Sequence, residues 1–170
     1  MAKKAFATYL IRKILLIVIV LGLVAGGVYG FLSIDTNKGL HTLAGQELTI
    51  EEITSEAPVV VIVYWHSSCQ YCADQIKVLN GLQVFFDYYY AQTGKGLGFV
   101  VGINVKDKDS AVQRYWSIMS PKFPTLAGGT PPTNATPVTE IYVSGQLKKQ
   151  FVGLVTYEQL ALAIEEIFDV

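Results

Sequence analysis

Cys69 and Cys72 are the residues of this sequence whose type and spacing best support chemistry. Two residues separate them, so one helical turn brings the second thiol beside the first. In thiol–disulfide exchange, a thiolate attacks a disulfide, and a neighbouring thiol then attacks the mixed disulfide that has formed. The spacing therefore predicts a redox dithiol in which Cys69 is the nucleophile and Cys72 is the resolving thiol.

The same pair of cysteines allows other interpretations. A closed zinc site needs four ligands, and the chain has no second cysteine pair and only two histidines, His41 and His66. A haem attachment motif needs a histidine directly after Cys72, where Ala73 stands. We therefore expect no metal ion here, and a structural disulfide without turnover is the remaining alternative.

The segments that flank the cysteines predict a strand followed by a helix. Residues 59–65 form a continuous β-branched and aromatic run, which is typical of a strand buried on both faces. Residues 73–92 lack proline and carry apolar residues at helical spacing. Cys69 is thus expected at or just before the start of a helix, where free N–H groups and the macrodipole favour a thiolate.

The remainder of the chain also alternates between strand and helix patterns. A second buried strand is expected within residues 97–105, and a helix over 111–119 with Asp107, Asp109 and Ser110 as candidate caps. Residues 120–137 hold five of the six prolines and are expected to form loop or short extended pieces. Strands over 138–143 and 146–152 and a final helix to about residue 168 complete a predicted α/β domain.

The N-terminal segment predicts a membrane anchor. Residues 14–34 hold no charged side chain, and as a helix they would span about 31 Å, close to the hydrocarbon thickness of a bilayer. Four basic residues and no acidic residue precede this run, which favours a cytoplasmic N-terminus. We expect a cytoplasmic segment at 1–13, the anchor at 14–34, a linker at 35–42 and an outer domain at 43–170. A cleavable signal peptide is the alternative, although its apolar region is usually shorter.

Composition excludes several classes of protein. With 51% hydrophobic and 16% charged residues and a mean hydropathy of +0.38, the chain fits neither a disordered protein nor a plain cytosolic enzyme. The net charge of −1 indicates no basic surface for nucleic acid. Residues 35–170 hold nine basic and fourteen acidic residues, a net charge of −5, so no polybasic patch holds this part on lipid.

Residues 59–72, with Trp65 four positions before Cys69, resemble the active-site segment of the thioredoxin superfamily. Thr136-Pro137 before a strand, then a glycine turn and a terminal helix, resemble the second half of that fold. The strand and helix between these two parts resemble the insertion of the TlpA-like branch, which includes membrane-anchored, outward-facing thiol reductases such as ResA, the cytochrome c maturation thioredoxins and the copper-sensitivity protein ScsD. The resemblance implies a thioredoxin-like fold, a central mixed sheet flanked by helices, after one transmembrane helix.

The resemblance also implies roles for individual residues. Pro137 would follow a cis peptide bond and, with the backbone of Thr136, would align a substrate strand against the dithiol. Tyr71 and Trp65 are expected as further substrate contacts. No cofactor is implied beyond the redox-active Cys69–Cys72 pair.

The resemblance further implies partners and a location. The substrates would be disulfide-containing exported proteins or apocytochrome c, and a membrane thiol reductase of the DsbD or CcdA type would supply electrons. Membrane lipid would contact residues 14–34. The expected location is the bacterial inner membrane, with the domain in the periplasm or extracytoplasmic space.

Some positions depart from the family pattern. Val63 stands where thioredoxin has a buried aspartate, and Gln75 stands where ResA-like proteins carry a glutamate. The usual proton acceptors are therefore missing, and Asp74 is the nearest carboxylate in the sequence. His66 is either a group that stabilises the thiolate or a polar loop residue. A disulfide oxidase or isomerase, or a non-catalytic assembly protein with this fold, are the alternative functions.

Overall fold

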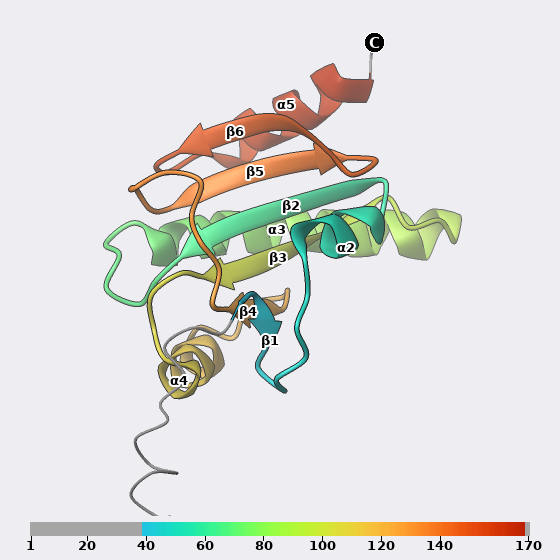
Figure 1. The fold of residues 1–170 in the computed structure, drawn as a ribbon. Helices are drawn as coiled ribbons and strands as arrows, with labels where there is room; N and C mark the ends of the chain where they lie inside the picture. Colours follow the sequence, from blue (N-terminus) through green and yellow to red (C-terminus); the bar gives the residue numbers. More distant parts are fainter. Residues whose placement is uncertain (1–38, 169–170) are drawn as a thin grey trace, which may run out of the picture. The chain divides into compact units, whose positions relative to one another are not determined.

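The computed structural model describes residues 39–168, which form six strands and four helices (Figure 1). The predicted cytoplasmic segment 1–13 and the predicted anchor 14–34 lie outside the described residues. Within residues 39–168, no helix has both the length and the apolar character needed to cross a membrane. The elements, in chain order, are β1 (His41–Thr42), α2 (Ile50–Ser55), β2 (Val59–Trp65), α3 (Cys72–Thr93), β3 (Gly98–Asn104), α4 (Asp109–Met119), β4 (Thr125–Ala127), β5 (Val138–Val143), β6 (Gln146–Val152) and α5 (Tyr157–Phe168).

The six strands form one mixed sheet in the order β1-β4-β3-β2-β5-β6. Strand β2 runs parallel to β3, with Trp65 opposite Asn104, and antiparallel to β5, with Tyr64 opposite Val138. The carboxyl ends of β2 and β3 and the beginning of β5 therefore meet at the same edge of the sheet. The loops that leave this edge carry the candidate site.

Strand β2 is buried on both faces, as its unbroken apolar run predicts. Its odd-numbered residues pack in one cluster with apolar side chains of α3, α4 and α5. Its even-numbered residues pack in a second cluster with Ile53 and Ile50 of α2. Helices α3 and α5 thus cover one face of the sheet and α2 the other (Figure 1). This confirms the predicted sheet with helices on its two faces.

Trp65, the last residue of β2, lies at the centre of an aromatic stack. Its ring centroid lies 5.1 Å from that of Tyr115 and 4.9 Å from that of Trp116, both on α4. The Trp65 Nε1–H donates a hydrogen bond of 3.1 Å to Thr125 Oγ1. At Gly102 on β3, a Cβ atom would approach the Trp116 ring to 2.8 Å, so only glycine fits beneath this stack.

Two local predictions are corrected by the structure. The candidate caps of the helix expected over 111–119 do not cap it: α4 begins at Asp109, its N-cap is Lys108, and no side chain hydrogen-bonds there. Asp107 is used elsewhere, as described below. The sheet also begins earlier than expected, because His41 pairs with Ala127 of β4, so His41 and Thr42 belong to an edge strand and not to a linker.

Candidate active site

The two cysteines form a disulfide with a Cα–Cα distance of 5.4 Å and an S–S distance of 2.08 Å. Cys72 is fully buried and is the first residue of α3. Cys69 is only partly buried and packs against the edge of the core cluster. This asymmetry makes Cys69 the cysteine that another protein can reach, and it places Cys72 behind it.

Cys69 lies in a hydrogen-bonded turn that precedes the helix. Its backbone N–H donates to the carbonyl of His66 at 3.2 Å, and its carbonyl accepts the N–H of Cys72 at 3.4 Å. The helix N-cap is Tyr71, which makes no side-chain cap. The sequence places Cys69 at or just before the helix start, whereas α3 begins three residues later because these turns extend the β2–α3 connection.

The β3–α4 loop supplies the strongest polar anchor of this turn. Asp107 accepts hydrogen bonds from the backbone N–H and the hydroxyl of Ser67, each at 2.7 Å, and from the Asn104 side-chain amide at 2.8 Å. Burial disfavours the charged carboxylate, but the hydrogen bonds from Asn104 and Ser67 and the nearby His66 lower the pKa of Asp107 below its usual value. A carboxylate therefore holds the chain two residues before Cys69.

The sequence pattern does not indicate Asp107 and Asn104 as site residues, and it indicates Asp107 only as a candidate helix cap. Their place in the chain is nevertheless a signal for the site. Asn104 ends β3, which runs parallel to β2, and Asp107 follows three residues later. The carboxyl ends of adjacent parallel strands lie side by side, so polar residues just after β3 meet the residues that follow β2.

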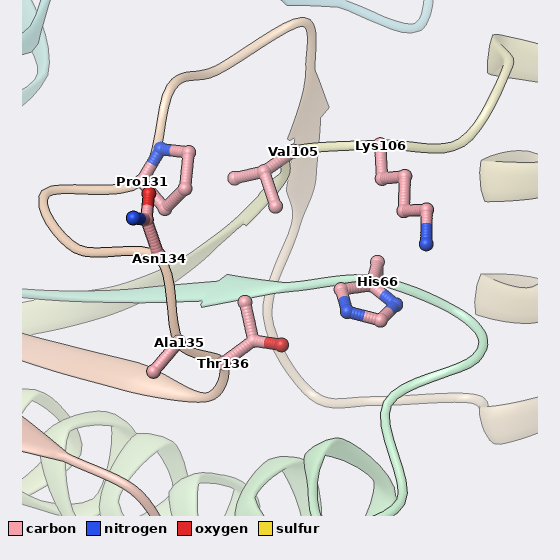
Figure 2. A pocket seen from close by; sticks show the side chains of 7 residues that line it. All are labelled: His66, Val105, Lys106, Pro131, Asn134, Ala135 and Thr136. Atoms are coloured by element: carbon pink, nitrogen blue, oxygen red, sulfur yellow. The ribbon is translucent and has the colours of Figure 1, made fainter.

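A shallow hollow of about 310 Å³ lies beside this turn (Figure 2). Figure 2 shows His66 and Lys106 on one side and Thr136, Ala135 and Asn134 on the other. The hollow therefore joins the β2–α3 turn, the end of β3 and the loop before β5. Its full lining is His66, Val105, Lys106, Pro131, Asn134, Ala135 and Thr136.

The Thr136–Pro137 peptide bond is cis, as the resemblance implies. The Pro137 carbonyl accepts the N–H of Gly153 at 2.8 Å, which holds this loop onto the end of β6. Thr136 faces the hollow together with His66, whose Nδ1 lies 3.0 Å from the hydroxyl of Ser68. The structure thus brings the predicted Thr136–Pro137 loop to the same edge of the sheet as the dithiol turn.

Two expected substrate contacts have different outcomes. Tyr71, between the cysteines, has 52% of its surface exposed and is available to a partner. Trp65 has no exposed surface, because its ring is stacked between α4 side chains and its indole N–H is bonded to Thr125. The expectation that Trp65 contacts a substrate is therefore wrong, and the residue supports the site from within the core.

Val63 and Gln75, which stand where the family carries an aspartate and a glutamate, are both in the core. Val63 is fully buried in the cluster shared with α3. Gln75 is fully buried, and its Oε1 accepts the backbone N–H of Val155 at 2.8 Å. Asp74, the nearest carboxylate in the sequence, is on the surface and pairs with Lys77 at 2.9 Å. Asp74 is therefore not a buried replacement for the missing aspartate or glutamate.

Sheet order, helix placement, the disulfide at the start of α3 and the cis Thr136–Pro137 bond at the same edge of the sheet together define a thioredoxin-like fold. No protein-family model matches the sequence, and no curated protein sequence matches it. Solved structures do match, and they confirm the predicted thioredoxin-like fold.

Three of these structures illustrate the likeness. StoA of Bacillus subtilis matches with a TM-score of 0.53 and 16% identity over 75% of this chain and 95% of that one. A DsbF homologue of Corynebacterium diphtheriae gives 0.57 and 20%, over 74% and 81%. A secreted Mycobacterium tuberculosis disulfide oxidoreductase homologous to Escherichia coli DsbE gives 0.56 and 14%, over 76% and 96%.

Proposed function

We propose that this protein is a membrane-anchored, extracytoplasmic thiol:disulfide oxidoreductase that reduces disulfides in exported proteins or apocytochrome c. The observation that carries the proposal is the Cys69–Cys72 disulfide, in which a partly exposed cysteine precedes a fully buried one at the start of α3. Such a pair has the two positions that a nucleophilic and a resolving thiol need. The fold is shared with proteins named as disulfide oxidoreductases.

The reaction starts from the reduced dithiol. The Cys69 thiolate attacks one sulfur of the substrate disulfide, a mixed disulfide forms, and the expelled substrate thiolate takes a proton from water. The Cys72 thiolate then attacks the Cys69 sulfur, the bond between Cys69 and the substrate breaks, and the second substrate thiol leaves. The substrate gains two electrons and the protein dithiol becomes a disulfide.

Substrate binding is assigned to the surface around Cys69. Tyr71 offers an exposed aromatic ring beside the disulfide. Thr136 offers its backbone groups beside the hollow that it lines, and Pro137, whose carbonyl is bonded to Gly153, holds this loop in place for the substrate. An extended substrate segment that lies along this loop brings its disulfide to Cys69.

The anchor and the electron donor complete the proposal. Residues 1–13 lie in the cytoplasm, residues 14–34 cross the membrane, residues 35–40 act as a linker, and the domain that begins with β1 lies outside, in the periplasm or extracytoplasmic space. The oxidised Cys69–Cys72 pair is reduced again by a membrane dithiol reductase of the DsbD or CcdA type, whose two thiols become a disulfide. The apolar run at 14–34 and the basic residues before it support this arrangement.

The proposal is tested with the full-length chain in an insulin-disulfide reduction assay, with a small dithiol as the electron source. We expect Cys69→Ser to lose the catalysed reduction, because the attacking thiolate is gone. We expect Cys72→Ser to accumulate a mixed disulfide with the substrate, because the resolving thiol is gone. If Cys69→Ser reduced insulin as fast as the unchanged chain, the proposed oxidoreductase function would be wrong.

The direction of the reaction is tested by the reduction potential of the Cys69–Cys72 pair, measured against a glutathione buffer. A reductase needs a potential near or below that of thioredoxin, about −270 mV. A value well above that favours the alternative function of an oxidase or isomerase.

A further inference from the structure

Gln75 holds a buried hydrogen-bond donor that no protein group uses. The side chain is fully buried, its Oε1 accepts the N–H of Val155 at 2.8 Å, and its Nε2 has no hydrogen-bond partner. Among the described residues, Nε2 of Gln75 and Oγ1 of Thr139 are the buried side-chain polar atoms in this condition. Buried polar atoms are nearly always satisfied, so this unused donor requires an explanation.

The position of Gln75 relates it to the resolving cysteine. Gln75 follows Cys72 by three residues on α3, a spacing that puts two side chains on the same face of a helix. Both residues are fully buried, and α3 packs this face against the sheet. The bond from Val155 fixes the amide through its oxygen, so the nitrogen cannot turn to that backbone group.

We infer that Gln75 Nε2 donates a hydrogen bond to the Cys72 sulfur when the disulfide is reduced, and so stabilises the Cys72 thiolate that resolves the mixed disulfide. This role rests on the proposed function. In the disulfide state Nε2 bonds to no group, the Cys72 sulfur included, so the inferred bond forms only on reduction, when a charged sulfur becomes the stronger acceptor. In the reduced state a thiolate in apolar surroundings is unfavourable unless a donor faces it.

The chemistry of an amide limits what Gln75 does. A glutamine side chain is neutral and takes no proton from a thiol at ordinary pH, so it acts as a donor and not as a general base. The proton of the Cys72 thiol passes to water, and the substrate thiolate released at resolution takes a proton from water. The Cys69–Cys72 bond forms as the bond from Cys69 to the substrate breaks.

Gln83 on the same helix provides a matched control. Its Oε1 also accepts a buried backbone N–H, that of Val100 at 2.8 Å, and its side chain is also buried. Its Nε2, in contrast, is bonded to Asp87 at 2.8 Å. Gln83 lies eleven residues beyond Cys72, about 16 Å along the helix, so it does not reach the sulfur.

The experiment follows the ionisation of the Cys72 thiol by ultraviolet absorbance of the thiolate against pH, in the full-length chain carrying Cys69→Ala. We expect Gln75→Met to move the titration midpoint up by about one unit, because a hydrogen bond to a charged group is lost. We expect Gln75→Leu, which also lacks the amide donor, to move it up by a similar amount. Gln83→Met is expected to leave it unchanged.

An unchanged midpoint in both Gln75 variants would overturn the inference, as would an equal shift in Gln83→Met, since that would indicate general loosening of α3. If Gln75→Met does not fold by circular dichroism, the Gln75→Leu titration decides the result. Because this measurement needs no turnover, its outcome is independent of the insulin assay, and failure of either proposal can be recognised separately.

Discussion

Asp107 accepts hydrogen bonds from both the backbone N–H and the hydroxyl of Ser67, each at 2.7 Å, across forty residues of sequence. Ser67 precedes Cys69 by two residues, so this carboxylate connects the β3–α4 loop to the turn that carries the exposed cysteine. Asn104 at the end of β3 holds the same carboxylate in place. The geometry of the dithiol turn therefore depends on a residue of the loop that follows the neighbouring strand β3.

Replacing Asp107 with alanine is expected to weaken both stability and catalysis. The substitution leaves the Ser67 N–H and the Asn104 amide without their acceptor, which costs about 1–3 kcal/mol of unfolding free energy. The loosened turn should also slow insulin reduction. Urea unfolding and the insulin assay measure the two effects. Asp87→Ala, an exposed carboxylate farther along α3, is the control and should affect both less; equal effects would contradict the anchoring role.

The pH dependence of stability should report the same carboxylate. The folded pKa of Asp107 lies below its unfolded value of about 3.9. A group of this kind contributes stability that is complete above the unfolded pKa and is lost as the pH falls through the folded pKa. We expect the unfolding free energy to fall below about pH 4, and to fall less steeply in Asp107→Asn. If the unfolding free energy fell equally steeply below about pH 4 in the unchanged chain and in Asp107→Asn, the lowered pKa of Asp107 would be contradicted.

Tyr71→Ala should weaken substrate binding with little effect on stability. The ring is half exposed beside the disulfide, so its loss removes a partner contact and not core packing. We expect KM for insulin to rise roughly five-fold, which corresponds to about 1 kcal/mol of binding energy. Steady-state kinetics measures this change. Tyr88→Ala, which removes a 63% exposed tyrosine of α3 away from the dithiol, should leave KM unchanged.

The face of the sheet that α2 covers holds a buried carboxylate that is fully hydrogen-bonded. Glu140 on β5 is 3% exposed and accepts from the hydroxyl of Tyr64 at 3.0 Å, the hydroxyl of Tyr142 at 2.9 Å and the amide of Gln150 at 2.8 Å. Burial, together with the charge of Glu140, raises the pKa of Tyr64 well above its usual value. This network supports the strand that follows Pro137.

This network leads to a prediction for alkaline pH. A tyrosine whose folded pKa is raised contributes stability that is present below its unfolded pKa of about 10 and is lost as the pH rises towards the folded pKa. We expect the unfolding free energy to decline above about pH 10. In Tyr64→Phe it should be lower by about 1–3 kcal/mol at neutral pH and decline less steeply in alkali. If the unfolding free energy declined equally steeply above about pH 10 in Tyr64→Phe, Tyr64 would not be the group responsible.

Local patterns in the sequence are enough to predict the main strands and helices and the Cys69–Cys72 dithiol. The continuous apolar run at 59–65 is readable as a doubly buried strand because every side chain in it favours burial on both faces. The spacing of Cys69 and Cys72 and the helical pattern after them are local as well. These features depend on residues within a few positions of one another, so the order of strands and helices and the dithiol are predictable.

Which side chains meet at the site depends on how the strands and helices pack. Asp107 reaches Ser67 because β2 and β3 lie side by side and in parallel, and Trp65 is withdrawn from any substrate because α4 packs over it. The unpaired nitrogen of Gln75 depends on where Val155 falls after β6. Such contacts join residues dozens of positions apart, and their geometry is set by packing, which no local pattern records.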